Sequence, residues 1–166
     1  GVGETGPWAW NGSVTDLAQQ VRKSITSTMR GPQPTDQQVA ALTAYLRTLD
    51  PAPSMAEARR PAGPGPAHDH LGVTDGERTF RRRGCYDCHK PGILTSAEAY
   101  DVGLSDKVGG SPYNPPSLRG VSQRNRLLHD NRARDLYEVF AKFEHGLDGA
   151  LGPQELEDLV IYLRSL

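Results

Sequence analysis

The chain lacks the features that identify several large classes of protein. Its 166 residues carry a formal net charge of −1, so no strong field directs it to nucleic acid or to a membrane surface. No apolar run reaches the roughly 18 residues of a membrane-spanning helix. No signal peptide is visible at Gly1 and no initiator Met is present, so we expect a processed or truncated product.

Cysteine and methionine are also scarce, with two residues of each. Two cysteines are too few for a disulfide framework. Glycine (18 residues) and proline (13 residues) are abundant, above their usual combined share of roughly 12%. Much of the chain is therefore expected to be loop. A loop-rich chain with a modest core needs a further organiser, and a large apolar cofactor would serve.

Two segments have the apolar spacing of amphipathic helices. The first is "PTDQQVAALTAYLRTL", where Thr35 or Asp36 is the expected N-cap, and the second is "GPQELEDLVIYLRSL". A shift of 117 positions aligns the two segments. Six of the fifteen positions in 35–49 then match identically: Gln37, Leu42, Tyr45, Leu46, Arg47 and Leu49.

The similarity extends upstream of both helices. The segment "WNGSVTDLAQQV", from Trp10, resembles "HDNRARDLYEVF", from His129, at a shift of 119. Each copy reads as a turn, a capped helix, a loop and a closing helix. The chain is therefore predicted to hold the end of one repeat and the whole of a second.

These patterns divide the chain into three parts. Residues 1–50, here called module one, are the tail of a first module. Residues 51–70 form a linker rich in Pro, Ala and Gly. Residues 71–166, called module two, are expected to begin with a short helix capped by Asp75, anchored inward by Phe80 and ended at Gly84. Residues 91–120 are predicted to be mostly loop, so the fold class is all-α.

Both cysteines lie in "RRRGCYDCHKPG". Structural zinc normally takes four ligands, often from two cysteine pairs, and only one pair exists. A thioredoxin-like pair sits in a βαβ unit, and no such strands are evident. A Cys85–Cys88 disulfide would be strained and would leave His89 without a role.

The pattern C-x-x-C-H is the attachment signal of c-type haem. Two thiols about one helical turn apart can each add to a vinyl group of one porphyrin. The residue that follows then supplies the proximal imidazole to the iron. We therefore predict one covalent haem, held by Cys85 and Cys88 and ligated by His89.

Several motifs around this site resemble the C-terminal haem domain of bacterial di-haem cytochrome c peroxidases and their MauG-like relatives. They are "GERTFRRRGCYDCH", "NPPSLRGV", "LLHDNRARDLYEVF" and "ELEDLVIYLRSL". Residues 1–49 resemble the tail of the family's first haem domain, and "WNGSVTDL" is similar to its W-D/N-G-R turn. The resemblance covers nearly the whole chain. It implies a cytochrome c-like fold with long loops.

The resemblance also implies two haems, of which one accepts electrons and the other binds and cleaves peroxide. The first domain's C-x-x-C-H is absent from this sequence, so it lies upstream on a longer precursor or on another chain. The family implies a bacterial periplasmic or extracellular location. It further implies that Arg119 pairs with a haem propionate, that His129 makes a hydrogen bond near one, and that "YNPPSLRG" lends carbonyls to a calcium ion.

The second axial ligand of the iron is left open by the motifs. His145 is our first choice, because it follows the Asp135–Phe143 helix where the family often has a distal ligand, and because imidazole is a common haem ligand. Met29 is the corresponding candidate for a haem in module one, with core packing beneath Trp8 and Trp10 as the alternative. Met55, His68 and His70 lie in the linker, where solvent-exposed roles are expected.

Five basic residues flank the attachment motif: Arg78, Arg81, Arg82, Arg83 and Lys90. Three roles are open for these residues: a solvated helix face, a docking surface for an acidic redox partner, or pairing with haem propionates.

Three functions fit these residues. The first is electron transfer at a closed haem, with a redox partner protein and an upstream haem domain or another subunit. The second is a peroxidase or oxidase, with Glu144 or His145 as acid–base. The third is a structural accessory haem subunit.

Overall fold

The computed structural model describes residues 1–51, 53, 71–104 and 112–166, and these residues are mainly helical. Within them there is no strand, only three isolated bridges, and no helix is long and apolar enough to cross a bilayer. Met55, His68, His70 and most of the predicted linker lie outside the described residues. The elements are η1 (Val2–Glu4), α1 (Leu17–Lys23), η2 (Ser24–Thr28), α2 (Asp36–Arg47), α4 (Leu71–Arg82), α5 (Cys85–Cys88), η3 (Val121–Gln123), α6 (Leu136–Ala141) and α7 (Pro153–Ser165).

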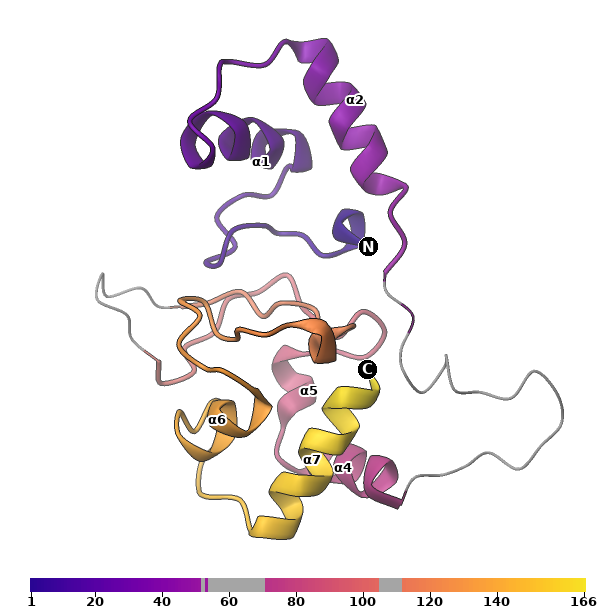
Figure 1. Cartoon of the computed structure of the whole chain (residues 1–166), viewed down its shortest axis with the longest axis vertical. Helices are drawn as coiled ribbons and strands as arrows, with labels where there is room; N and C mark the ends of the chain where they lie inside the picture. The colour runs from indigo at the N-terminus through magenta and orange to yellow at the C-terminus, as the bar shows by residue number, and fades with distance from the viewer. Residues whose placement is uncertain (52, 54–70, 105–111) are drawn as a thin grey trace, which may run out of the picture.

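Figure 1 shows module one, with α1 and α2, on the side of module two that is formed by its loops. The two meet through loops. The Asn114 backbone N–H donates to the Trp10 carbonyl at 2.9 Å, and the Trp10 and Tyr113 rings lie 5.6 Å apart. Arg119 lies 3.9 Å from the Glu4 carboxylate. The tail of module one is thus bound to the loop segment of module two.

The core of module two forms where α4 packs on α7. Gly76 makes this contact close, because a Cβ at this position would lie only 2.0 Å from the Asp158 carbonyl oxygen and 2.5 Å from the Tyr162 Cβ. Phe80 is buried one turn further along α4, as its apolar position predicts. The largest fully buried side chains of the core are Phe80, Leu159, Val160 and Leu163.

The expected start of α4 was wrong. The helix begins at Leu71, so Asp75 lies inside it and pairs with Arg78 at 2.5 Å instead of capping the N-terminus. Val73, which precedes Asp75, packs against the core. Burial of this additional apolar position favours continuing the helix upstream. The end of the segment agrees with expectation, because Gly84 takes a left-handed φ of 70°.

The other helix starts follow their capping residues. At α2 the Thr35 hydroxyl accepts from the Gln38 N–H at 3.3 Å, and the Gln38 side chain accepts from the Thr35 N–H at 2.9 Å. Thr35 is therefore the cap and Asp36 the first helical residue. Asp135 caps α6 by accepting from the Glu138 N–H at 2.9 Å. Asp16, which corresponds to Asp135 in the repeat, caps α1 in module one.

The sequence repeat has the same local geometry in both copies. The bridge between Trp8 and Val14 is matched, 119 positions later, by one between Leu127 and Ala133. Within these turns Ala9 and Leu128 have left-handed φ values of 64° and 67°. Such values are uncommon for residues other than glycine, so their recurrence makes a chance similarity of two amphipathic helices a poor explanation.

α2 and α7, the last helices of the two modules, differ in how far their apolar faces are covered. Leu159 and Tyr162 on α7 are 0% and 7% exposed, whereas their counterparts Leu42 and Tyr45 on α2 are 43% and 61% exposed. In module two α4 packs on this face. In the described part of module one no helix takes the place of α4, so the corresponding apolar face of α2 lies open.

Substituting Ala for Gly76 tests the α4–α7 contact. Alanine is the better residue in a helix by roughly 1 kcal/mol, yet here its Cβ would collide with backbone. We expect G76A to lower the free energy of unfolding by about 1–3 kcal/mol, measured by urea denaturation. Gly149, where an added Cβ would meet nothing within 4 Å, provides the control G149A. Equal stability of G76A and the parent would contradict the packing described.

Candidate functional site

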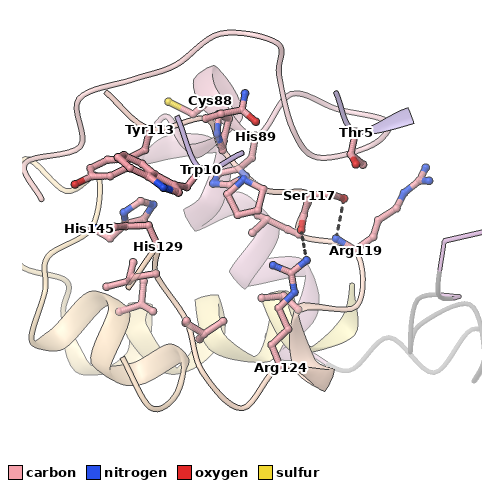
Figure 2. A pocket seen from close by; sticks show the side chains of 18 of the residues that line it. Thr5, Trp10, Cys88, His89, Tyr113, Ser117, Arg119, Arg124, His129 and His145 are labelled. Atoms are coloured by element: carbon pink, nitrogen blue, oxygen red, sulfur yellow. Dashed lines mark hydrogen bonds between the residues drawn. The ribbon is translucent and has the colours of Figure 1, made fainter. Parts of the chain in front are cut away.

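A cavity of about 870 Å³ opens where the loops of the two modules meet. Its size lies within the roughly 300–1,000 Å³ typical of pockets for large organic ligands. The walls are largely apolar. Module one contributes Trp8 and Trp10, and module two contributes side chains that include Phe80, Val121, Leu136 and Phe140. Residues distant in the sequence therefore enclose one space, part of which Figure 2 shows at close range.

Both cysteines reach this cavity from α5. The left-handed Gly84 turns the chain out of α4, and α5 begins at the next residue. Cys85 and Cys88 are free thiols and both line the cavity. Burial is the main cause that raises the pKa of the Cys85 thiol to about 11, and burial also raises the pKa of Cys88. Both groups are therefore present mainly as thiols at neutral pH.

His89 lies directly beside them and is held in one orientation. Its backbone N–H donates to the Cys85 carbonyl at 2.9 Å, and its Nδ1 lies 3.1 Å from the Leu94 carbonyl. Because a carbonyl can only accept, Nδ1 carries the proton, and Nε2 is left as an acceptor or metal ligand. Burial lowers the pKa of His89, against the opposing effect of the Leu94 and Pro116 carbonyls. The ring is thus kept in the neutral form that binds metal.

His145 lines the same cavity from the turn after α6. Its backbone N–H donates to the Val139 carbonyl at 3.1 Å, following Glu144, which has a φ of 47°. Its Nδ1 atom is buried and has no hydrogen-bond partner among the described residues. Burial, and secondly the charge of His89, lower the pKa of His145 to about 4. The two imidazoles are therefore close enough to interact electrostatically.

Met29 lies elsewhere. It is 72% exposed and is not among the residues that line the cavity, so the alternative of core packing beneath the tryptophans was wrong. The sequence places Met29 within about four residues of the counterpart of His145, and the backbone hydrogen bonds define that counterpart. The Gly31 N–H donates to the Ile25 carbonyl, as His145 donates to Val139. Because the helix of module one continues through η2, the structural counterpart of His145 is Gly31, and Met29 corresponds to Phe143.

His129 and Arg119, both expected near the cofactor, line the cavity. The His129 ring stacks on Tyr113 with centroids 4.2 Å apart. One Arg119 guanidinium nitrogen donates to the Gly92 carbonyl at 2.9 Å, and another lies near Glu4. Arg119 therefore ties together the loop after His89 and the start of module one.

The basic residues that flank the C-x-x-C-H motif form ion pairs with acidic side chains. Arg81 pairs with Glu77 at 3.0 Å and Lys90 with Glu98 at 2.8 Å. Arg82 and Arg83 both pair with Glu155, at 2.5 and 3.0 Å. None of the five predicted basic residues lines the cavity. The ion pairs brace α4 and the start of α7, which leaves little free positive charge for an acidic partner.

Sequence reasoning missed two further arginines. Arg124 and Arg126 line the cavity together with Arg119, and Figure 2 shows Arg124 directed toward Ser117. The signal was present in "RGVSQRNR", three arginines within eight residues. It was overlooked because the cavity wall forms only when this loop folds back over α5.

Among the described residues no three His, Cys, Asp or Glu side chains gather in a way that would hold a metal ion by themselves. The ligating groups of this site are instead two thiols and two imidazoles around a large apolar cavity. That set fits an iron porphyrin. The imidazoles of His89 and His145, which both line the cavity, provide nitrogen donors, and the apolar walls suit the macrocycle.

Comparison with known proteins identifies the fold. The chain has the all-α cytochrome c-like fold of haem proteins of the MauG and hydrazine synthase type. A chain of hydrazine synthase from Kuenenia stuttgartiensis superposes with a TM-score of 0.74 at 19% identity, covering 98% of this chain and 68% of that one. A MauG-like protein associated with microbial copper homeostasis gives 0.68 at 16% identity, covering 95% and 68%. No family model and no curated sequence matches.

Glu138 stabilises the helix that leads to His145. Its hydrogen bonds with Arg134 are the main cause that lowers the Glu138 pKa to about 2. A depressed pKa stabilises the fold fully above the unfolded value near 4.5, and this contribution is lost as pH falls toward 2. We therefore expect E138Q to be less stable than the parent at pH 7 in urea unfolding, with a smaller difference at pH 3. D148N controls for the loss of one negative charge, and a pH-independent difference for E138Q would refute this account.

Proposed function

We propose that this chain is a c-type haem protein that transfers electrons, with one haem bound through thioethers to Cys85 and Cys88. When bound, the iron supplies the redox chemistry by alternating between ferrous and ferric states. The proposal rests on the free thiols and His89, which face one apolar cavity, and on the cytochrome c-like fold. Each S–H would add across one vinyl double bond, so the attachment needs no leaving group.

His89 is the proposed proximal ligand. The bond from Nδ1–H to the Leu94 carbonyl orients the ring and makes Nε2 more basic, as hydrogen-bonded ligating histidines commonly are. Arg119 and His129 are the proposed contacts at the haem edge, since both line the cavity. A calcium ion at "YNPPSLRG" stays a prediction that rests on the family resemblance alone.

One observation favours electron transfer over peroxide chemistry. His145 lines the same cavity as His89, so its imidazole is available as a second ligand of a bound iron. Its Nδ1 is buried, so such ligation would use the other ring nitrogen, Nε2. If both His89 and His145 held the iron, peroxide would find no open coordination position, and the chemistry supplied by the group would be electron transfer.

The open face of α2 supports a role within a larger redox assembly. Leu42 and Tyr45 are exposed where the matching residues of α7 are covered by α4. We propose that another haem-bearing domain, on the same polypeptide or on another subunit, completes module one. A redox partner protein exchanges electrons with the assembly in the periplasm or outside the cell. An accessory, purely structural haem subunit would share this arrangement but would not be reduced by any partner.

Haem attachment is tested by replacing the thiols. We expect the parent protein, matured with a cytochrome c assembly system, to gain the mass of one haem and to give a pyridine haemochrome spectrum. C85S/C88S should lose the covalent mass, because no sulfur remains to form a thioether. S117A, which alters a cavity residue without sulfur, is the control. A parent protein without covalent haem would refute the proposal.

Replacing His145 tests whether this residue is the second ligand that would close the iron to peroxide. The parent should show a low-spin spectrum and no turnover of hydrogen peroxide. H145A should become high-spin, because a ligand is removed, while M29L should leave the spectrum unchanged, because Met29 is remote from the cavity. A high-spin parent that reduces peroxide would establish the peroxidase alternative, and a low-spin H145A would exclude His145 as a ligand.

A further inference from the structure

Three guanidinium groups line the cavity, all from the segment after Pro116: Arg119, Arg124 and Arg126. Arg124 and Arg126 are exposed and Arg119 is half-buried, so these charges lie where the cavity meets solvent. Two acidic side chains, Glu4 and Asp50, also line the cavity. In the part of the chain that the structure describes, Glu4 is the one carboxylate that forms an ion pair with these arginines.

The three arginines differ in the hydrogen bonds and ion pairs that their guanidinium groups already form. Arg119 is shared between the Gly92 carbonyl and Glu4. Arg124 has one hydrogen bond, in which a guanidinium nitrogen donates to the Ser117 carbonyl at 3.3 Å. Arg126 is exposed. Within the described residues neither Arg124 nor Arg126 forms an ion pair with a carboxylate, so both retain donors for an added anion.

The proposed haem brings two carboxylates, its propionates. Thioether bonds at the cysteines would hold the vinyl groups of the porphyrin near α5, and the propionates, which are carried on another part of the ring, would need partners elsewhere in the cavity. Figure 2 shows Arg124 well separated from Cys88 in the pocket, on the side of the Ser117–Arg119 segment. A guanidinium there can bind a carboxylate through two parallel N–H donors.

We propose that Arg124 and Arg126 bind the two propionates of the haem and thereby raise the reduction potential of its iron. This inference rests on the proposed haem attachment. Reduction removes one positive charge from the iron, so a nearby guanidinium stabilises the ferrous form relative to the ferric form. Without its arginine, a propionate leaves an uncompensated negative charge that stabilises the ferric form.

The test is a spectroelectrochemical titration of the haem-loaded protein. In R124Q and in R126Q we expect the ferrous-to-ferric ratio at a fixed electrode potential to fall about three- to tenfold. The double variant should fall further than either single variant. R124K keeps the charge and should stay closer to the parent than R124Q. R30Q is the matched control, because Arg30 is also exposed, lies outside the cavity and forms no ion pair within the described residues.

The outcomes separate this inference from the proposed function. If R124Q and R126Q carry covalent haem but titrate like R30Q, the propionate assignment is wrong and the haem assignment stands. If the parent carries no covalent haem, both are wrong. Equal shifts in R124K and R124Q would also refute the electrostatic role, because loss of charge would then not be the cause.

Discussion

The close approach of α4 and α7 at Gly76 holds the rest of module two in place. Because a glycine faces the Asp158 carbonyl, α4 lies deep against α7 and buries Phe80 in the core. The end of α4 then determines where Gly84 turns the chain, and that turn presents α5 to the cavity. The positions of both thiols and of the imidazole thus depend on a close contact made earlier in α4, at Gly76. Ion pairs from Arg82 and Arg83 to Glu155 reinforce the same junction.

The cavity belongs to both modules. Trp8 and Trp10 line it from module one, and the hydrogen bond between Asn114 and the Trp10 carbonyl fastens that wall. Module one is therefore part of the proposed haem site even though its own attachment motif is absent from the sequence. Three imidazoles and three guanidiniums line this space, so both the ligation and the potential of a bound iron would be set by residues from separate loops.

Much of the fold followed from local patterns. Capping residues and apolar periodicity located α2, α6 and α7. The internal repeat predicted matching turns in the two modules, and the structure shows a left-handed residue at the same place in each, Ala9 and Leu128. The start of α4 was missed because Asp75 looked like a cap, whereas burial of Val73 extends the helix past it. The sequence located the counterpart of His145 in module one only to within about four residues, because the helix of module one continues through η2.

By itself the sequence determined that two thiols and an imidazole lie close together, because Cys85, Cys88 and His89 fall within five consecutive residues. It also determined the repeat and the all-α class, which depend on short-range periodicity. Only the tertiary structure decided what surrounds that segment. His145, Trp10 and Arg124 come from distant parts of the chain, and they meet at one cavity because loops fold over a helix pair. Their convergence is long-range packing, which no local pattern encodes.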